Sequence, residues 1–264
     1  MRTKIIISVV VLVLAGLGFG VWSSKKSQAK PITQPWAEVL SDSLFEIDPV
    51  TREPKATIAS GDELEIGDML QTNNAGRATI HYPDGSAARI DSNTTFTVDS
   101  HSYNSENGQQ STGLKLEAGR IWSKVFELAT PSSSWEVKTS NTVATVRGTA
   151  FGVSAENNRT TIAGSEHEIT LQIRDSQTSS PIGDSALIGE KKYIVIDDGL
   201  LARLKDNPKA LIEAVTDVPE DVKNSEWGNN NRSQDDNQNL VLKQIKEKNS
   251  DKGAYRKAVA KHFQ

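Results

Sequence analysis

The sequence contains no cysteine and only four histidines, and these absences restrict the chemistry open to the chain. Without cysteine there is no disulfide, no thiolate ligand for zinc and no lipid attached through a thiol. No two of the histidines, His81, His101, His167 and His262, are close in sequence. We therefore expect no metal site and no cofactor.

An excess of basic residues is also missing. The net charge is -4, whereas a dedicated nucleic-acid binder usually shows a basic excess or stripe, so we expect no nucleic-acid partner. The sequence has no Gly-x-Ser-x-Gly, no His-Glu-x-x-His and no glycine-rich phosphate loop. Glu166, His167 and Glu168 alternate along a predicted strand and do not converge. We predict that the chain is not an enzyme.

The N-terminal segment Ile5 to Trp22 reads IIISVVVLVLAGLGFGVW and carries no charge. As a helix it would extend about 27 Å, close to the thickness of the hydrocarbon core of a bilayer. We predict a transmembrane signal anchor over 5–22, preceded by a cytoplasmic stub at 1–4 and followed by a polar tether at 23–36. A cleaved signal peptide ending near Ser27-Gln28-Ala29 is the alternative interpretation.

The flanking charges are nearly balanced, so the topology with the main domain in the cytoplasm stays open. The favoured topology is a single pass through the cytoplasmic (inner) membrane. It places the main domain in the periplasm or outside the cell.

Residues 37–197 show short alternating runs separated by turns, without helical periodicity. Ala78, Ile80 and Tyr82 would share one face of a strand, and Asp84-Gly85 then predicts a hairpin rather than a cation site. The strand spacing of roughly 10–20 residues favours a compact, coil-like or sandwich-like β domain. The predicted fold class is mainly β.

The composition changes after this domain. We predict a helical segment over 198–223, a disordered linker over 224–239 and a helical tail over 240–264. The linker prediction depends on its six asparagines and its few apolar residues.

The run Thr142 to Val153, TVATVRGTAFGV, is the most informative part of the sequence. Read as one strand, it places Val143, Arg147 and Val153 on one face and small residues on the other. Gly148 would allow a bulge that re-aims the strand. If Arg147 is buried in a β layer, carbonyls or a carboxylate should hold its charge.

Four short motifs together resemble the FecR domain of bacterial envelope proteins, over roughly 55–173. They are a turn at Gly67-Asp68, the hairpin at Asp84-Gly85, a segment from Gly119 to Trp122, and the run Val146, Arg147, Gly148, Thr149, Ala150, Phe151. The resemblance implies an all-β domain outside the cytoplasmic membrane.

The chain also departs from the FecR regulators of iron uptake. Those regulators carry a cytoplasmic segment that binds a sigma factor ahead of the membrane helix, and here only Met1 to Lys4 stands there. Their C-terminal module has no evident counterpart in the helical tail. The resemblance thus supports the domain and its compartment, and it does not support sigma-factor control or iron uptake.

These observations predict a membrane-anchored, non-enzymatic binding, scaffold or sensing module whose partners are the membrane and an envelope protein or polymer. One alternative is a carbohydrate or peptidoglycan binder, which would show an exposed aromatic pair near Trp122 or Trp135. Another is a regulatory signalling component of an envelope pathway.

Overall fold

The computed structural model describes residues 33–128, 130–175, 178, 180–249, 258–259 and 261–262. The chain divides after Pro31, and the described residues all belong to the unit that begins at Ile32. The predicted transmembrane helix over 5–22 lies outside the described residues, as do the stub and most of the tether. No helix in the described part of the chain is both long and apolar enough to span a bilayer.

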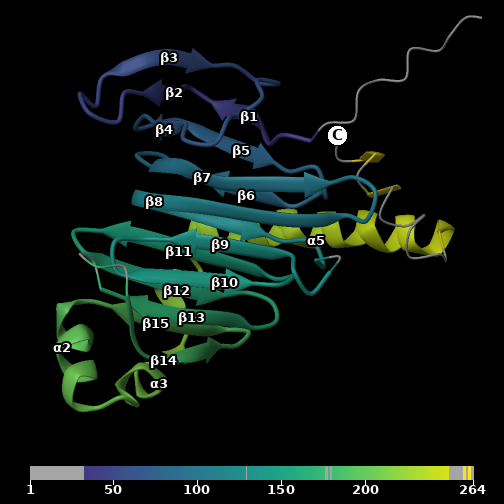
Figure 1. Cartoon of the computed structure of the whole chain (residues 1–264). Coiled ribbons are helices and arrows are strands. Elements are labelled where there is room, and N and C mark those ends of the chain that lie inside the picture. The colour runs from purple at the N-terminus through teal and green to yellow at the C-terminus, as the bar shows by residue number, and fades with distance from the viewer. Residues whose placement is uncertain are drawn as a thin grey trace, which may run out of the picture. The chain divides into compact units, whose positions relative to one another are not determined.

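The described strands form two sheets that share one long strand, β8 (Gln109–Lys124) (Figure 1). In spatial order, sheet A contains β1 (Trp36–Ser41), β5 (Arg77–His81), β6 (Ala87–Ile90), the second part of β8, β11 (Ala150–Glu156), β12 (Arg159–Gly164), β15 (Lys192–Ile196) and β16 (Thr216–Asp217). Sheet B contains β3 (Pro54–Ile58), β2 (Leu44–Ile47), β4 (Met69–Thr72), β7 (Thr95–Asn104), the first part of β8, β9 (Ser134–Lys138), β10 (Thr142–Val146), β13 (Ile169–Arg174) and β14 (Pro181–Ile188).

Hairpins placed alternately in the two sheets make the fold both sandwich-like and coil-like. The chain forms β5–β6 in sheet A, β9–β10 in sheet B, β11–β12 in sheet A and β13–β14 in sheet B. The colour gradient in Figure 1 therefore advances steadily along the stack of strands. Buried side chains from both sheets, such as Ile121 and Leu114, belong to one core cluster. The predicted mainly β fold class is confirmed.

The change of sheet within β8 occurs at Gly119. Up to Ala118 the strand pairs with β7, and from Gly119 onward it pairs with β11. Gly119 has a φ of +93°, and a Cβ there would lie 2.5 Å from the Cα of Thr94. A glycine is required because both the backbone angle and the close approach exclude a side chain.

The prediction that Thr142 to Val153 forms one strand is wrong. The run breaks at Arg147-Gly148-Thr149, where Gly148 has a φ of +130°, so β10 lies in sheet B and β11 in sheet A. Val146 and Phe151 both face the core, although they would lie on opposite faces of a continuous strand. The break changes the alternation because the chain turns a corner between sheets.

The described part of the C-terminal region, 198–249, is mostly helical, apart from β16. Its helices are α2 (Asp198–Asp206), α3 (Ala210–Glu213), α4 (Glu220–Lys223) and α5 (Glu226–Lys248). The prediction of a disordered linker over 224–239 is wrong, because α5 covers most of that range. Ser225 caps the helix by accepting from the amide of Gly228, and tertiary contacts to sheet A stabilise it.

Candidate functional site

The site lies on the outer face of sheet A, where α5 crosses β6 and β8. Arg89 on β6 and Trp122 on β8 are paired neighbours, and both side chains point away from the core. They contact the same carboxylate, that of Asp235 on α5. An Arg89 guanidinium nitrogen lies 2.6 Å from Oδ1, and Trp122 Nε1 donates to Oδ2 at 2.8 Å. The ion pair is buried, since its side chains are 8% and 3% exposed.

Two further polar contacts extend this docking along the helix. Gln238 donates from its amide to the carbonyl oxygen of Gly85, at 2.9 Å. Asn239 donates to Glu166 at 3.0 Å, and Glu166 also accepts from the buried ammonium of Lys124 at 2.6 Å. The helix is thus held mainly by hydrogen bonds and ion pairs.

Burial and charge shift the two carboxyls of the docking face in opposite directions. Burial raises the pKa of Asp235, and the nearby Arg89 and Trp122 offset only part of that rise. Burial also acts on Glu166, but the hydrogen bond and charge of Lys124 hold the pKa of Glu166 below its ordinary value. The Asp235 pair therefore involves a desolvation cost comparable with its attraction, as is typical of buried ion pairs.

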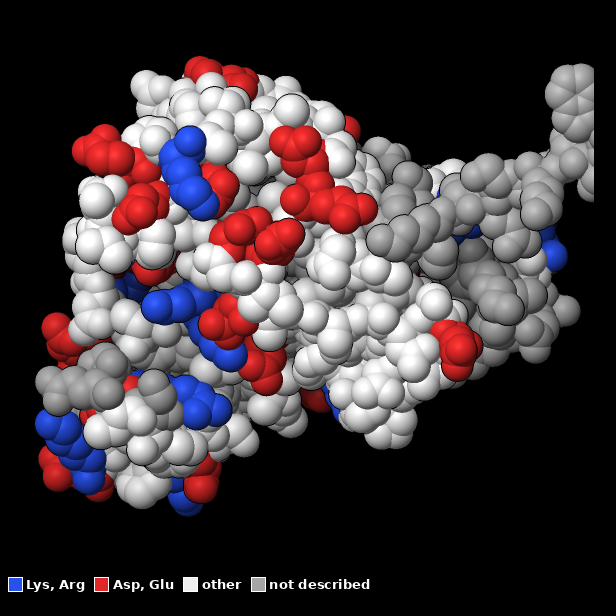
Figure 2. Space-filling model, turned by 45° about the horizontal axis from the view of Figure 1, so that its top comes forward, with Lys and Arg blue, Asp and Glu red and all other residues white. Residues whose placement is uncertain are grey.

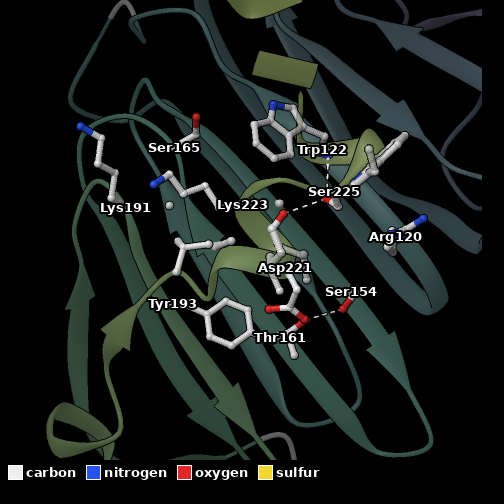
Figure 3. A pocket seen from close by; sticks show the side chains of 18 of the residues that line it. Arg120, Trp122, Ser154, Thr161, Ser165, Lys191, Tyr193, Asp221, Lys223 and Ser225 are labelled. Atoms are coloured by element: carbon white, nitrogen blue, oxygen red, sulfur yellow. Dashed lines mark hydrogen bonds between the residues drawn. The ribbon is translucent and has the colours of Figure 1, made fainter. Parts of the chain in front are cut away.

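A cavity of about 840 Å³ opens beside this docking face, between sheet A and residues 217–232 (Figure 3). Its floor is formed by β8, β11, β12 and β15, with the small residues Gly152, Ala163 and Gly164 in the middle. The Trp122 ring rests on Gly152, because a Cβ there would lie 3.2 Å from the ring. The cavity has the volume of a ligand site.

The walls combine aromatic, hydroxyl and charged groups. Tyr193 rises from β15, and Trp227 comes from the first turn of α5 with the Arg120 guanidinium 5.4 Å from its ring centre. Ser154 and Thr161 are hydrogen-bonded to each other across the floor (Figure 3). These groups suit a ligand with both apolar and polar parts.

Basic side chains outnumber acidic ones around the cavity, five to three. They are Arg120, Arg159, Lys191, Lys223 and Arg232, against Asp217, Glu220 and Asp221. By contrast, acidic side chains gather on the face of the molecule shown in Figure 2, with basic ones between them. The cavity is therefore more positive than its acidic chain as a whole, which favours ligands with negative charge.

The motif residues predicted from the sequence are spread along the sandwich and do not form one site. Gly67 and Asp68 make the turn before β4, where the Asp68 carboxylate accepts from the amide of Glu65. Asp84 and Gly85 make the predicted hairpin turn between β5 and β6. Among the motif residues, Gly85 and Trp122 contact α5.

Arg147 is exposed rather than buried in a β layer. Its guanidinium donates to the carbonyl oxygens of Pro131 and Thr130 at 2.7 and 2.8 Å, so it anchors the loop before β9. The neighbouring Thr149 is buried and donates to the carbonyl of Glu166. Arg147 therefore has a structural contact, and Thr149 connects this corner to Glu166, which also bonds Asn239 of α5.

The two tryptophans named for the carbohydrate-binding alternative are both buried, with exposed fractions of 4% for Trp122 and 0% for Trp135. The exposed pair expected of a carbohydrate binder is therefore not formed by these rings. Glu166 and His167 lie in a bend after β12 rather than in a strand. Among the described residues, no group of three histidines or carboxylates could hold a metal ion.

Sequence reasoning missed Arg89, Asp235, Tyr193 and Trp227. A weak signal for the helix was present, since Gly228, Asn231, Asp235 and Gln238 recur at intervals of three and four. Hydrophobic periodicity could not detect it, because every member of the stripe except the glycine is polar. The inward face of α5 is polar, whereas the inward face of a usual amphipathic helix is apolar.

Comparison with known proteins gives a family for the central part of the chain. Residues 68–169 match the family described as FecR protein. Two crystal structures of a proposed anti-sigma factor from Parabacteroides distasonis are similar, with 14% identity and a TM-score of 0.38, and 12% identity and a TM-score of 0.39. Each comparison covers 49% of this chain and 55% of the other, so this chain spans about half the length of that protein.

No curated protein matches the chain. The family match begins at Asp68 in the turn before β4 and covers the β5–β6 hairpin, the bend in β8 and the corner between β10 and β11. It confirms the resemblance predicted from the motifs, and residues 68–169 of this chain are the part that matches the FecR family.

Proposed function

We propose that the chain is a non-enzymatic binding module of the bacterial cell envelope, and that it takes part in regulatory signalling. Residues 5–22 would anchor it in the inner membrane, with the β domain in the periplasm or outside the cell. The FecR match supports the envelope setting. The cavity on the outer face of sheet A carries the binding proposal, because it is the size of a ligand site and is partly walled by a separate helical segment.

The arrangement favours a protein partner over a sugar. Trp122 uses its ring to pack on Gly152 and its Nε1 to bind Asp235, so little of it is free to stack on a sugar ring. The cavity is rich in basic groups, and its floor includes the small residues Gly152, Ala163 and Gly164, which suits an extended acidic segment. Binding would depend on shape and charge, without chemical conversion.

The test is to fill the cavity and measure partner capture from envelope extract with the full-length chain. Ala163→Leu places a larger side chain on the floor, between Gly152 and Tyr193. Thr170→Leu adds the same side chain at an exposed position of β13 in sheet B, outside the cavity, and is the matched control. We expect the partner to be lost with Ala163→Leu and kept with Thr170→Leu. Equal recovery with both variants would remove the cavity as the binding site.

The membrane topology is tested separately. Reporter fusions after Gln264 should be active with an enzyme that works only outside the cytoplasm. Activity of a cytoplasm-specific reporter at that position would contradict the proposed compartment.

A further inference from the structure

The docking of α5 on sheet A has an unusual basis, since the helix has little tendency to form by itself. Residues 226–239 include a glycine, five asparagines and no alanine or leucine. Asparagine and glycine are poor helix formers, and tertiary packing must therefore supply the stability of this part of α5. If the contacts with sheet A are lost, we expect residues 226–239 to lose their helical structure as well.

The contacts that hold it converge on a preformed carboxylate site. Arg89 and Trp122 are fixed side by side on adjacent strands of the sheet, and both donate to the Asp235 carboxylate. The Arg89 guanidinium also lies 3.4 Å from the amide oxygen of Gln238 and 3.5 Å from the carbonyl of Asn231. The sheet thus contributes the donors, and the helix contributes only acceptors to Arg89 and Trp122.

Such a surface would accept any helix that presents a carboxylate at the same place. The donor pair belongs to the FecR domain, whereas Asp235 lies outside the matched range. Because burial of the ion pair involves a large desolvation cost, the net free energy that holds α5 on the sheet is small compared with the attraction between the two charges. A competing helix with a carboxylate can therefore replace α5. Displacement would also remove the cavity wall that Trp227, Gly228 and Arg232 form.

We propose that Arg89 and Trp122 form a recognition site for an acidic side chain on a helix of a partner protein, and that Asp235 of α5 occupies this site until the partner displaces it. The inference rests on the proposed binding function and adds how access to the binding face is controlled. Residues 226–239 then lose their helical structure, and the open face presents both the carboxylate site and the floor of the former cavity to the partner.

Hydrogen exchange on the full-length chain tests the release of α5. Asp235→Asn leaves the buried Arg89 cation without its carboxylate, whereas Asp236→Asn makes the same change at the exposed neighbouring position. We expect the amides of 226–239 to exchange at least ten times faster in Asp235→Asn and unchanged in Asp236→Asn, with strand amides protected in both. Unchanged protection of α5 would overturn the proposal, and so would loss of strand protection together with that of α5.

A second measurement tests recognition in trans. A labelled peptide of residues 224–249 should bind the full-length Asp235→Asn chain, whose own helix is released. The same peptide carrying Asp235→Asn should bind at least ten times more weakly. No binding, or equal binding of both peptides, would refute carboxylate recognition at this site.

Trp122→Phe provides an independent variant if Asp235→Asn does not fold, because it removes one donor and keeps a ring on Gly152. It should also speed exchange in α5, and normal protection would overturn the proposal. These measurements need no natural partner. Their failure is therefore distinct from failure of the capture experiment with Ala163→Leu.

Discussion

Replacing Gly119 by alanine should destabilise the domain strongly, because this position needs both a left-handed backbone and free space. A residue with a Cβ in the left-handed region costs about 1–2 kcal/mol. The new Cβ would also lie 2.3 Å from Thr94 Oγ1 and 2.5 Å from Thr94 Cα, and relieving an overpacked contact costs about 1–3 kcal/mol. Together the two effects predict a loss of about 2–5 kcal/mol in the free energy of unfolding.

Gly67→Ala is the matched control for this variant. Gly67 has a φ of +100°, close to the +93° of Gly119, but a Cβ there would meet nothing within 4 Å. It should cost only the backbone part, about 1–2 kcal/mol. The difference between the two alanines therefore isolates the contact with Thr94.

Urea unfolding followed by tryptophan fluorescence gives the measurement. With a slope of about 3 kcal/mol per M, typical of larger single domains, the midpoint should fall by roughly 0.7–1.7 M for Gly119→Ala and by roughly 0.3–0.7 M for Gly67→Ala. Equal midpoints for the two variants would refute the argument that the bend of β8 requires a bare glycine.

Three further results are expected. Burial lowers the pKa of His101, so the unfolded chain takes up a proton first and the free energy of unfolding should fall as the pH drops below about 6.5. The urea midpoint of His101→Gln should therefore change less between pH 7.5 and 5.5 than that of the unchanged chain, and an equal slope would contradict this. Trp135→Ala should lower the free energy of unfolding by about 3–5 kcal/mol in the same assay, because the ring is fully buried. Trp135→Phe should cost much less, because it keeps a ring and loses only the long hydrogen bond to Ser123, at 3.3 Å; similar losses for the two variants would argue against packing as the main contribution. Arg147→Ala should cost about 1 kcal/mol and speed exchange at the start of β9, and unchanged exchange would show that the two carbonyl contacts do not order the loop.

The turns of the sandwich could be predicted because their chemistry is local. Asp84-Gly85 forms its hairpin with hydrogen bonds between residues two to four positions apart. The alternation of Ala78 and Ile80 likewise predicts which side of β5 faces the core, even though the partner strands are not known from the sequence. Short-range geometry and burial on one face are visible in a sequence.

The corner between β10 and β11 could not be predicted, because two continuations were locally acceptable. Threonine, valine and alanine fit a straight strand as well as they fit two strands joined at Gly148. The position of Glu127 decides between a straight strand and two strands, because its Cα lies 3.0 Å from where a Cβ of residue 148 would be. That contact spans 21 residues of chain and is set only when the sheets assemble.

The helix α5 was missed for a related reason. Its sequence favours a flexible, polar chain, and the contacts that make it a helix come from Arg89, more than 130 residues earlier. A buried polar stripe gives no hydrophobic signal, and local propensity opposes it. Tertiary contacts therefore override the local preference, as they do when a segment folds only against its binding surface.

The outward side chains of one strand determine where α5 binds. After the bend at Gly119, Arg120 lies over Trp227, Trp122 binds Asp235, and Lys124 reaches Asn239 through Glu166. Positions 120 and 124 are about 13 Å apart along the strand, and positions 227 and 239 are about 18 Å apart along the helix, so both elements pass through the same contacts in the same order.

This shared order couples the FecR-like part of the chain to the C-terminal helix α5. A shift of one residue after the bend would turn Ile121 and Ser123 outward and remove all three contacts at once. The glycine that bends β8 thus fixes the register of the core and, through it, the surface that α5 occupies. If a substitution at Gly119 shifts this register and the sandwich stays folded, α5 should be released while the two sheets remain intact.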